Sequence, residues 1–427
     1  MTDQTRICVV GLGYVGLPLA VALAKHFPTV GMDINRRRID ELNSGHDRTG
    51  EVDKARLKAS PLKLTADPAQ VGNNDVFIIT VPTPIDEANH PDLGALRAAC
   101  TTVGKIMAKG AVIVVESTVY PGVTEDICGP VLAAASGMTC GTDFFLGYSP
   151  ERINPGDREH TVDRVTKVIS GQTPAVVALL EKIYGTVTTG GTFAAASIKA
   201  AEAAKVIENA QRDINIAFMN EVTMIFNRMN LSVYDVLAAS RTKWNFLPFT
   251  PGLVGGHCIG VDPFYLAECS QRLGHHPEVI LAGRRINDTM AGYVTQQIAR
   301  RIVANGKGDK ARILVLGLAF KENVPDLRNS KVADVIKGLA AWGFHIDVHD
   351  PLAYGDDAMH EYGLTLLPNL DAAKNYDCVI GAVAHEQYAG FTAKHLTGLV
   401  KSDGLVADIK GMWRKLELPA SIGRWEF

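Results

Sequence analysis

The chain has 427 residues, of which 47% are hydrophobic, so it can fill two or three packed domains. Its formal net charge is −3 with both signs mixed along the chain, which argues against a nucleic-acid-binding protein. No apolar run reaches membrane-spanning length and no cleavable leader is expected, so we predict no membrane association. The 7 cysteines are odd in number, scattered and without metal-ligand spacing, which indicates a reduced cytoplasmic protein with no metal site.

Short β-rich runs alternate with longer helical patterns in the first part of the chain. The predicted strands are residues 7–10, 29–33, 75–81, 111–116 and 143–148. Such alternation is typical of a parallel sheet with helices on both faces.

From about residue 194 to 229 the pattern changes, because the segment KAAEAAKVIENAQRDINIAFMNEVTMIFNRMN contains neither Pro nor Gly. We interpret it as one long helix, either a spine between domains or a subunit interface, with a helix buried inside one domain as the alternative. After Gly308 the alternation resumes, with strands predicted at 312–316, 345–349, 377–382 and 405–409. The predicted fold class is therefore α/β, with two Rossmann-like, doubly wound parallel-sheet domains joined by a central long helix.

A glycine-rich turn follows the first predicted strand. Gly11, Gly13 and Gly16 occur as G-L-G-Y-V-G ahead of a helical pattern. The first glycine allows a tight turn, the second lets backbone N–H groups approach a pyrophosphate, and the third lets helix and strand pack closely. Asp33 ends the next predicted strand, at the spacing of a carboxylate that binds an adenosine ribose. These features predict an NAD site, since Asp33 would repel the 2′-phosphate of NADP even with arginines at 36–38; a tight turn with a solvated Asp is the alternative.

The segment G-G-H-C-I-G-V-D-P-F-Y-L puts Cys258 on a glycine turn ahead of a helix whose start is marked by Asp262 and Pro263. A thiol near a helix N-terminus ionises more easily, which suits a nucleophile. The same place suits a small packing cysteine, and Asp262 suits an N-cap. This segment alone does not decide between the two interpretations.

Polar side chains share one face of the long helix. Lys205 and Asn209 are four residues apart, and Arg212 continues nearly the same stripe. A solvated face would explain them equally well. A dehydrogenase that forms an oxyanion at the reacting carbon benefits from a fixed cation and an amide donor beside it, which favours a catalytic role.

Two further loops end strands of the first predicted sheet. E-S-T-V-Y-P-G surrounds Thr118, and Y-S-P-E-R-I-N-P-G-D contains Glu151. Ligands of open parallel sheets bind at the carboxyl ends of the strands, so both residues are expected to face nicotinamide and substrate. A plain Pro/Gly turn is the alternative for the second loop.

Together these segments resemble the UDP-sugar 6-dehydrogenases of the UDP-glucose/GDP-mannose dehydrogenase family over nearly the whole chain. GLGYVG, ESTVYPG, EAAKVIEN, GGHC with Asp262, and GLAFKENVPDLRNS occur in that family's order. The resemblance implies an NAD-binding domain at 1–193, a central helical dimerisation and catalytic domain at 194–300, and a UDP-sugar-binding domain at 301–427, in a homodimer or larger homo-oligomer. GLAFKEN agrees with a second nucleotide site of another kind, because it lacks the full dinucleotide fingerprint.

The resemblance also implies a mechanism. The C6 alcohol loses a hydride to NAD, Cys258 attacks the aldehyde to give a thiohemiacetal, and a second hydride transfer leaves a thioester that water hydrolyses with help from Asp262. Lys205 stabilises the oxyanions, assisted by Asn209 and by an ordered water at Thr118. Glu151 helps to position or activate the hydrolytic water.

The predicted site residues fall into three sets. Catalytic residues are Cys258, Lys205, Asn209, Asp262, Thr118 and Glu151. NAD contacts are expected from Gly11, Gly13, Tyr14, Val15, Gly16, Asp33, Arg38, Thr83 and Thr118. UDP-sugar contacts are expected from Glu151, Arg152, Ile153, Lys205, Asn209, Arg212, Arg241, Gly255, Phe320, Lys321, Arg328 and Lys410. Of these, Lys321, Arg328 and Lys410 match positions that approach the diphosphate or the sugar, and Arg241 reaches across from the partner subunit.

The resemblance also bears on the substrate. The UDP-glucose branch carries a Phe-Leu pair after the loop glutamate and a serine before the nucleophile, whereas this chain has Arg152-Ile153 and His257. The S-P-E-R and G-G-H-C forms are similar to the branch that oxidises 2-acetamido sugars, and the segments near His46 and at I-N-P-G-D favour UDP-GlcNAc or UDP-GalNAc, for surface polysaccharide precursors. UDP-ManNAc and UDP-glucose remain alternatives, because no physical feature of the sequence separates the epimers.

Two other classes of protein fit part of the sequence. A non-catalytic nucleotide-binding sensor would keep the fold, but here the thiol, lysine, asparagine and aspartate positions are all filled. A two-electron hydroxyacid dehydrogenase would explain the first half of the chain. It would leave the second α/β domain and G-G-H-C without a role.

Overall fold

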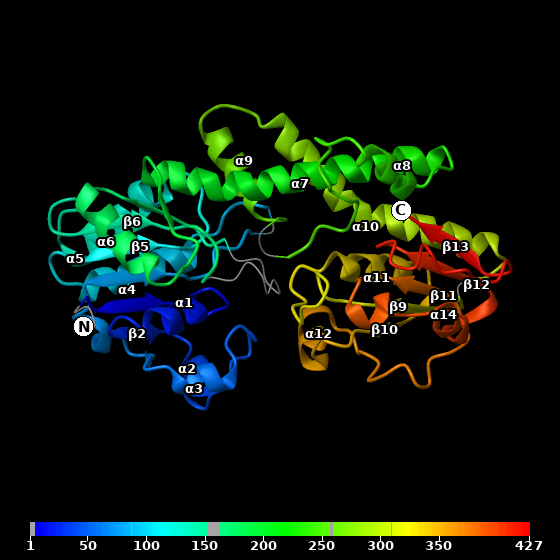
Figure 1. The fold of residues 1–427 in the computed structure, drawn as a ribbon, viewed down its shortest axis with the longest axis horizontal. Helices are drawn as coiled ribbons and strands as arrows, with labels where there is room; N and C mark the ends of the chain where they lie inside the picture. The colour runs from blue at the N-terminus through cyan, green and yellow to red at the C-terminus, as the bar shows by residue number, and fades with distance from the viewer. Residues whose placement is uncertain (1–4, 87, 153–162, 257–258, 309) are drawn as a thin grey trace. The chain divides into compact units, whose positions relative to one another are not determined.

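The computed structural model describes residues 5–86, 88–152, 163–256, 259–308 and 310–427. Contacts divide the chain into two compact units (Figure 1). The first unit comprises Met1–Glu208 with Phe264–His276, and the second comprises Asn209–Pro263 with Pro277–Phe427. The helix α7 (Ile198–Arg228) and the helix α9 (Asp262–Arg272) each contribute residues to both units.

The first unit is built on a sheet in the order β3-β2-β1-β4-β5-β6-β7-β8. Its strands are β1 (Ile7–Val10), β2 (Thr29–Met32), β3 (Lys63–Thr65), β4 (Val76–Ile79), β5 (Val112–Val115), β6 (Phe145–Tyr148), β7 (Lys167–Gly171) and β8 (Thr192–Ala194). Neighbouring strands pair in parallel except β6 and β7, which pair antiparallel. The five strands predicted for this part of the chain are all present, and three further strands extend the sheet at its edges.

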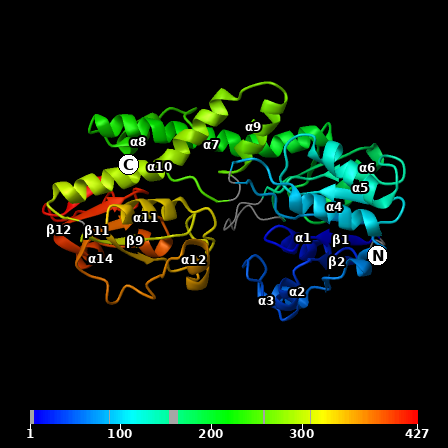
Figure 2. The same cartoon turned by 180° about the vertical axis from the view of Figure 1, so that it is seen from behind.

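Helices cover both faces of this sheet. They are α1 (Gly16–Leu23), α2 (Arg36–Asn43), α3 (Lys54–Ala59), α4 (Gly94–Ile106), α5 (Gly129–Ser136) and α6 (Pro174–Gly185), with short helical turns at Pro68–Val71 and Val123–Cys128. Residues of α1 and α6 pack on one face, where Val9 and Ile78 point. On the other face α4 contacts β4 and packs side by side with α5 (Figures 1 and 2). The carboxyl ends of the strands are therefore left to the connecting loops.

The second unit has a parallel sheet in the order β10-β9-β11-β12-β13. Its strands are β9 (Arg312–Leu316), β10 (His345–His349), β11 (Tyr376–Gly381), β12 (Val400–Asp408) and β13 (Gly423–Glu426). Its helices, besides part of α7, are α8 (Val233–Ser240), α10 (Glu278–Ala304), α11 (Lys331–Ala341), α12 (Gly355–Tyr362), α13 (Glu386–Ala389) and α14 (Ala393–Leu399). The predicted second α/β sheet is thus confirmed, and β13 adds a strand that the sequence did not indicate.

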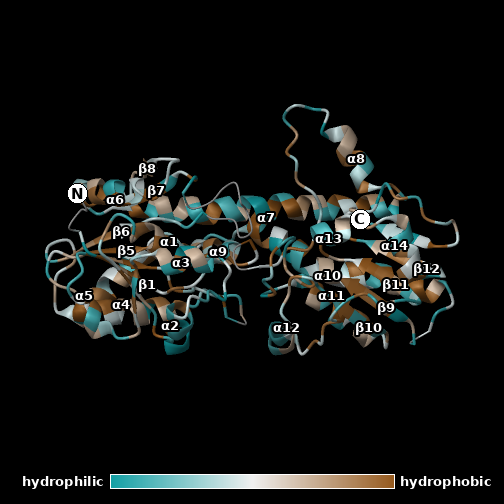
Figure 3. Cartoon of the chain, turned by 60° about the horizontal axis from the view of Figure 1, so that its bottom comes forward, coloured by the Kyte–Doolittle hydropathy of each residue, from teal (hydrophilic) through white to brown (hydrophobic). Residues whose placement is uncertain are grey.

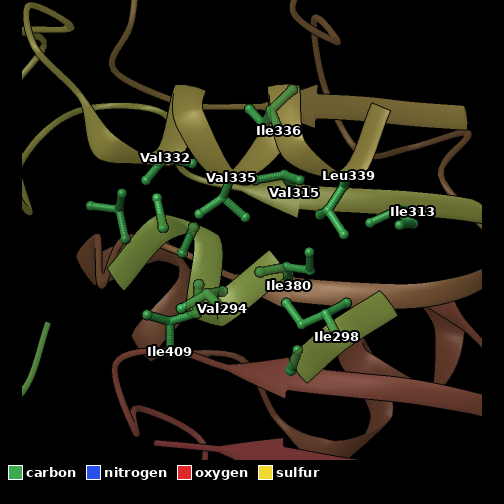
Figure 4. Packing of buried hydrophobic residues seen from close by; sticks show 14 of the residues in the cluster. Val294, Ile298, Ile313, Val315, Val332, Val335, Ile336, Leu339, Ile380 and Ile409 are labelled. Atoms are coloured by element: carbon green, nitrogen blue, oxygen red, sulfur yellow. The ribbon is translucent and has the colours of Figure 1, made fainter. Parts of the chain in front are cut away.

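Apolar side chains fill both faces of this second sheet. On one face Val294 and Ile298 of α10 and Val335 of α11 pack over Val315 and Ile380 (Figure 4). The opposite face packs against α13 and α14 in a cluster that includes Trp413. The strands β9 and β11 are coloured as hydrophobic in Figure 3, as expected of strands that are covered on both sides.

Candidate functional site

The glycine turn of the first unit has the shape that a dinucleotide requires. Gly11 has a φ of +93°, and a Cβ built at Gly16 would lie 1.9 Å from the carbonyl oxygen of Gly11. At Gly13, by contrast, no described atom lies within 4 Å of such a Cβ. Val15, the residue before α1, makes no side-chain cap to the described helix start. The turn is therefore closed on its protein side and open at Gly13, so its residues fit a pyrophosphate at the start of α1.

Asp33 lies just beyond β2 and is joined to this turn. One carboxylate oxygen accepts from the backbone N–H of Leu12 at 2.9 Å and the other from that of Asn35 at 2.9 Å. The side chain is only partly buried. A carboxylate oxygen has more than one lone pair, so Asp33 keeps acceptor capacity toward a ribose hydroxyl.

Arg38 supports the turn from beneath. Its Nε donates to the carbonyl oxygen of Leu12 at 2.9 Å, and its guanidinium pairs with the Asp47 carboxylate at 2.7 Å. The residue is 5% exposed, and its remaining terminal nitrogen has no hydrogen-bond partner among the described atoms. Arg38 thus holds the glycine turn in place, while Arg36 and Arg37 are exposed on α2.

The loops after β4 and β5 are tied to each other. The Thr83 hydroxyl donates to the carbonyl oxygen of Thr118 at 2.8 Å, and the Ser117 hydroxyl donates to that of Val81 at 2.6 Å. Tyr265 of α9 donates to the carbonyl oxygen of Thr83 at 2.6 Å. The predicted cofactor residues Thr83 and Thr118 are therefore brought together at the carboxyl edge of the sheet.

Glu151 lies at the same edge, 8% exposed, after β6. Its carboxylate is 3.7 Å from the ammonium of Lys167, which also contacts the carboxylate of Glu116. Next to it, Arg152 is exposed and forms an ion pair with Glu208 at 2.7 Å. The predicted contact Ile153 lies outside the described residues.

Asn209 and Asp262 form a buried pair. The side-chain N–H of Asn209 donates to the Asp262 carboxylate at 2.5 Å, and the two residues are 4% and 1% exposed. Asp262 is the first residue of α9, as predicted from D-P-F-Y-L. Arg212, which is exposed, reaches the Asn209 side-chain oxygen at 3.5 Å. Lys205, one turn earlier on α7, is 6% exposed, so this part of the helix is not a solvated face.

The glycines before the predicted nucleophile are packed against another loop of the second unit. A Cβ at Gly255 would lie 2.4 Å from the carbonyl oxygen of Asn329. Gly256 has a φ of +82°, and a Cβ there would lie 2.8 Å from the ring of Phe320. Both positions therefore require glycine. Cys258 itself, together with His257, lies outside the described residues.

Asn220 fixes the other end of this segment. Its side-chain N–H donates to the carbonyl oxygen of Gly252 at 3.0 Å, and its oxygen accepts from the Gly252 N–H at 2.9 Å. The same Asn220 bonds Asn287 of α10, whose side chain bonds Asp213 of α7. This buried polar ladder was not predicted, because asparagines on helices carry no distinctive sequence signal.

The predicted UDP-sugar residues of the second sheet lie on loops at its carboxyl edge. Lys321 is half-buried, and Arg328 is exposed and pairs with Asp326 at 2.7 Å. Lys410 follows β12, and its ammonium would lie 3.7 Å from a Cβ at Gly252. Arg241 ends α8, is exposed, and donates to the carbonyl oxygen of Phe249 at 3.3 Å. Gly252, Phe320 and Lys410 therefore lie around one loop region within this unit.

A buried histidine, which the sequence did not single out, anchors the loop that contains Lys321. The Asn323 N–H donates to His385 Nδ1 at 2.9 Å, so Nε2 carries the proton and donates to Asp350 at 3.1 Å. Asp350 is 5% exposed and also accepts from four backbone N–H groups, of Leu318, Ala319, Leu352 and Ala353. Burial opposes ionisation of Asp350, but these donors outweigh it and lower its pKa.

The first sheet, with its glycine turn and the partly buried carboxylate of Asp33, and the second parallel sheet that follows it in the chain are typical of a nucleotide-binding enzyme with two Rossmann-like units. Family models agree with this class. The NAD binding, central and UDP binding domains of the UDP-glucose/GDP-mannose dehydrogenase family match residues 5–188, 199–289 and 314–415. The chain belongs to this family, and it is an NAD-dependent UDP-sugar dehydrogenase.

Individual relatives cover nearly the whole chain. A UDP-N-acetyl-D-glucosamine 6-dehydrogenase of Pseudomonas aeruginosa is 52% identical over 95% of this chain and 96% of its own length. A protein of the same name from Salmonella typhi is 46% identical over 96% of both chains. The solved structure of the UDP-D-ManNAc dehydrogenase from Pyrococcus horikoshii superposes with a TM-score of 0.88 at 28% identity, covering 99% of both chains.

Within the described part of the chain, no group of three or more His, Cys, Asp or Glu side chains is arranged to hold a metal ion. None of the described helices combines the length and the apolar character needed to cross a membrane.

Proposed function

We propose that this dehydrogenase oxidises the C6 alcohol of a UDP-N-acetylhexosamine, UDP-GlcNAc or UDP-GalNAc, to the uronic acid. The reaction removes four electrons and passes through a thiohemiacetal and a thioester on Cys258. The observation that carries this proposal is the buried Asn209–Asp262 pair at the start of α9, shortly after the G-G-H-C segment in the chain. Such a pair suits a site where a carboxylate and an amide act on one reacting carbon.

The cofactor site of this proposal is the open glycine turn. The pyrophosphate would be held at the start of α1 by Gly11, Gly13, Tyr14, Val15 and Gly16. Asp33 would bind the ribose, and Arg38 would hold the turn itself in place. The loops beside the nicotinamide would be lined by Thr83 and Thr118. NAD, when bound, accepts the hydride in each of the two oxidations.

Residues of the chain carry the remaining chemistry. The thiolate of Cys258 adds to the C6 aldehyde, and its oxidised adduct is a thioester. Lys205 and the amide of Asn209 stabilise the oxyanion at C6, since both are buried, where such interactions are strong. Asp262 and Glu151 bind or activate the water that hydrolyses the thioester. Thr118 holds an ordered water beside the same carbon.

The UDP-sugar would be held mainly by loops of the second sheet. Lys321, Arg328 and Lys410 supply positive charge for the diphosphate or the sugar, and Gly255 and Phe320 would line the sugar site. Arg152, Ile153 and Arg212 complete the contacts. Arg241, at the exposed end of α8, would reach the sugar site of a partner subunit.

A 2-acetamido sugar is favoured over glucose by the Arg152 and His257 positions. Within the acetamido sugars, the two relatives named for UDP-N-acetyl-D-glucosamine share 52% and 46% identity with this chain, whereas the UDP-D-ManNAc structure shares 28%. These identities support UDP-GlcNAc, and its C4 epimer UDP-GalNAc is kept as the second candidate on the sequence motifs alone. UDP-ManNAc and UDP-glucose are the alternative substrates.

We also propose a homodimer formed through α7, by a cytoplasmic enzyme that makes precursors of surface polysaccharides. Phe218 and Ile225 on this helix are 55% and 47% exposed, and their spacing puts them on one face; Met229, which directly follows the helix, is 59% exposed. An apolar stripe on a long helix is usually buried against another element or another subunit. In this proposal the NAD domain spans residues 1–193, the central domain 194–300 and the UDP-sugar domain 301–427.

The test is a substrate panel with product analysis. Values of kcat/KM are measured with NAD for UDP-GlcNAc, UDP-GalNAc, UDP-ManNAc and UDP-glucose, and the products are identified by mass. We expect the acid of one of the first two sugars to form with the highest kcat/KM. A preference for UDP-glucose or UDP-ManNAc would reject the proposed substrate, and no NADH with any sugar would reject the proposed reaction.

A further inference from the structure

The loop that joins α2 to α3, residues 44–53, contains the motif G-H-D-R-T-G-E-V-D, which resembles the branch acting on acetamido sugars (Figure 1). The structure describes the whole of this loop, and the loop contains no helix or strand. It folds instead around one carboxylate, that of Asp47. The contacts of Asp47 within the first unit lead to the glycine turn.

Asp47 gathers the donors of its own loop. Its carboxylate accepts from the backbone N–H groups of Thr49, Glu51 and Val52 at 3.0, 3.1 and 3.0 Å. The Thr49 hydroxyl donates to it at 2.7 Å. Burial opposes ionisation of Asp47, but the donors of Arg38, Thr49 and Val52 outweigh burial and lower its pKa. The loop is therefore built around a buried, ionised carboxylate.

Arg38 joins this carboxylate to the glycine turn. Its Nη2 donates to Asp47 at 2.7 Å, and the two side chains are 6% and 1% exposed. Its Nε donates to the carbonyl oxygen of Leu12 at 2.9 Å. The N–H of Leu12 in turn donates to the Asp33 carboxylate at 2.9 Å. Loop, arginine and turn thus form one continuous chain of hydrogen bonds.

The peptide groups of Leu12 lie between the two glycines on which the cofactor site depends. Gly11 has a φ of +93°, and Gly13 is open, with no described atom within 4 Å of a Cβ built there. A buried ion pair adds little stability over apolar side chains of the same volume, because both charges lose their hydration. It does fix a direction, since the planar guanidinium bonds Asp47 and Leu12 at once in a single orientation. Asp47 therefore sets how Arg38 holds the turn.

We propose, on the basis of the cofactor site proposed above, that Asp47 is a positioning residue for NAD that acts through Arg38 on the glycine turn. Without the carboxylate, the buried guanidinium loses its fixed partner and no longer holds the carbonyl group of Leu12 in one place. The backbone N–H groups of the turn then lie away from the positions that a pyrophosphate needs. The motif around Asp47 thus serves the cofactor and not the 2-acetamido group of the sugar.

The experiment measures the Kd of NAD and the Kd of UDP by calorimetry, with wild type and with Asp47→Asn. We expect the Kd of NAD to rise about tenfold, the equivalent of one hydrogen bond to a charged group, and the Kd of UDP to stay unchanged. With NAD saturating, the ratio of kcat/KM for UDP-GlcNAc to that for UDP-glucose should also stay unchanged.

The matched control is Glu41→Gln, which removes a carboxylate at the other side of the same loop. Glu41 pairs with the exposed Arg48, whose Nε donates to it at 2.6 Å. Both Kd values of this variant should equal those of wild type. An equal rise in the Kd of NAD in Glu41→Gln and Asp47→Asn would show an effect of net charge alone and would overturn the inference.

A double variant tests whether Asp47 acts through Arg38. Arg38→Met alone should weaken NAD binding, because the bond to Leu12 is lost. Adding Asp47→Asn should weaken it no further, since two residues that act as one unit are not additive. A second loss of about tenfold in the double variant would mean that Asp47 acts by another route, against the inference.

The remaining outcomes also decide the matter. A folded Asp47→Asn protein with the wild-type Kd of NAD overturns the inference, as does an equal loss of NAD and UDP binding, which indicates general damage. A changed ratio of the two sugars with unchanged NAD binding overturns it in favour of a sugar site.

If Asp47→Asn does not fold, Arg38→Lys replaces it. The lysine ammonium can pair with Asp47 but lacks the fork that also reaches Leu12, so an unchanged Kd of NAD again overturns the inference. Wild-type protein that binds no NAD rejects the proposed cofactor site and the inference with it. Wild-type protein that binds NAD but forms no uronic acid rejects only the proposed reaction.

Discussion

The two sheets begin with the same turn but use it differently. Gly11 and Gly317 have φ values of +93° and +96°, and each N–H donates at 2.8 Å to the carbonyl oxygen of the residue that ends the neighbouring strand. In each turn the next N–H bonds a carboxylate beyond that strand, Asp33 at 2.9 Å or Asp350 at 2.7 Å. The local geometry of one Rossmann-like unit is therefore repeated in the other.

The difference lies in what else these carboxylates bind. Asp33 accepts from two backbone N–H groups and is partly exposed beside the open Gly13. Asp350 is buried, accepts from four backbone N–H groups, and also binds His385. The first carboxylate can serve a ligand, whereas the second is fully occupied in holding its own loops. A shared turn therefore does not imply a shared way of binding nucleotides.

The largest expected effect is loss of stability on Asp350→Ala. The change leaves several buried donors without an acceptor, so the free energy of unfolding should fall by roughly 4 kcal/mol. Urea denaturation measures this, with Asp371→Ala at an exposed position as the control. A loss below about 1 kcal/mol, the size of one ordinary hydrogen bond, would mean that Asp350 does not hold these loops together.

The corresponding change in the first turn, Asp33→Asn, should act on the cofactor instead. Loss of a charged acceptor for the ribose should weaken NAD binding by about 2 kcal/mol, near thirtyfold in Kd, and should narrow the preference for NAD over NADP. Calorimetry with both cofactors provides the measurement, and Asp40→Asn on the exposed side of α2 is the control. Unchanged NAD affinity in a folded variant would remove Asp33 from the cofactor site.

A smaller effect, on the pH dependence of stability, is expected from the buried carboxylate of Glu202 in the first unit. Glu202 accepts from the Gly122 and Thr124 N–H groups but has no histidine partner among the described residues, and burial raises its pKa to about 6. Because the folded state holds this proton more tightly than the unfolded state, Glu202 lowers stability as pH rises from about 4 to 6. Asp350, whose pKa is lowered, has the opposite sign and loses its contribution as pH falls.

Comparing wild type with Glu202→Gln isolates this effect. The free energy of unfolding of the variant, relative to wild type, should rise by between about 1 and 2 kcal/mol from pH 4 to pH 7. Denaturation curves across this range measure it, and the exposed Glu181→Gln should give a flat difference. A flat difference for Glu202→Gln would show that its buried charge carries no penalty.

Much of the fold could be predicted because buried parallel strands appear in the sequence as short apolar runs. The strands 7–10, 312–316 and 345–349 were predicted with the bounds of β1, β9 and β10, and the helix expected near 194–229 is α7 at Ile198–Arg228. β7 could not be predicted in this way, since it begins with the polar Lys167 and follows a polar stretch. Its antiparallel direction depends on tertiary packing.

Site residues could be predicted where a short sequence motif has a recognisable chemical role. The glycine turn with Asp33, and the start of α9 at Asp262, both appear in the structure as expected. Lys167, His385 and Asn220 were missed because their roles come from partners far away in sequence, such as Glu116, Asn323 and Gly252. The position of Cys258 lies outside the described residues, so its role stays a prediction.

The most direct test of the proposed reaction is the ratio of NADH to uronic acid formed from the best substrate of the panel, measured with wild type and with Cys258→Ala. Four-electron oxidation through a covalent thioester requires two NADH for each acid, no free aldehyde, and no acid from the variant. One NADH for each sugar with an aldehyde product, or normal acid formation by Cys258→Ala, would contradict the account.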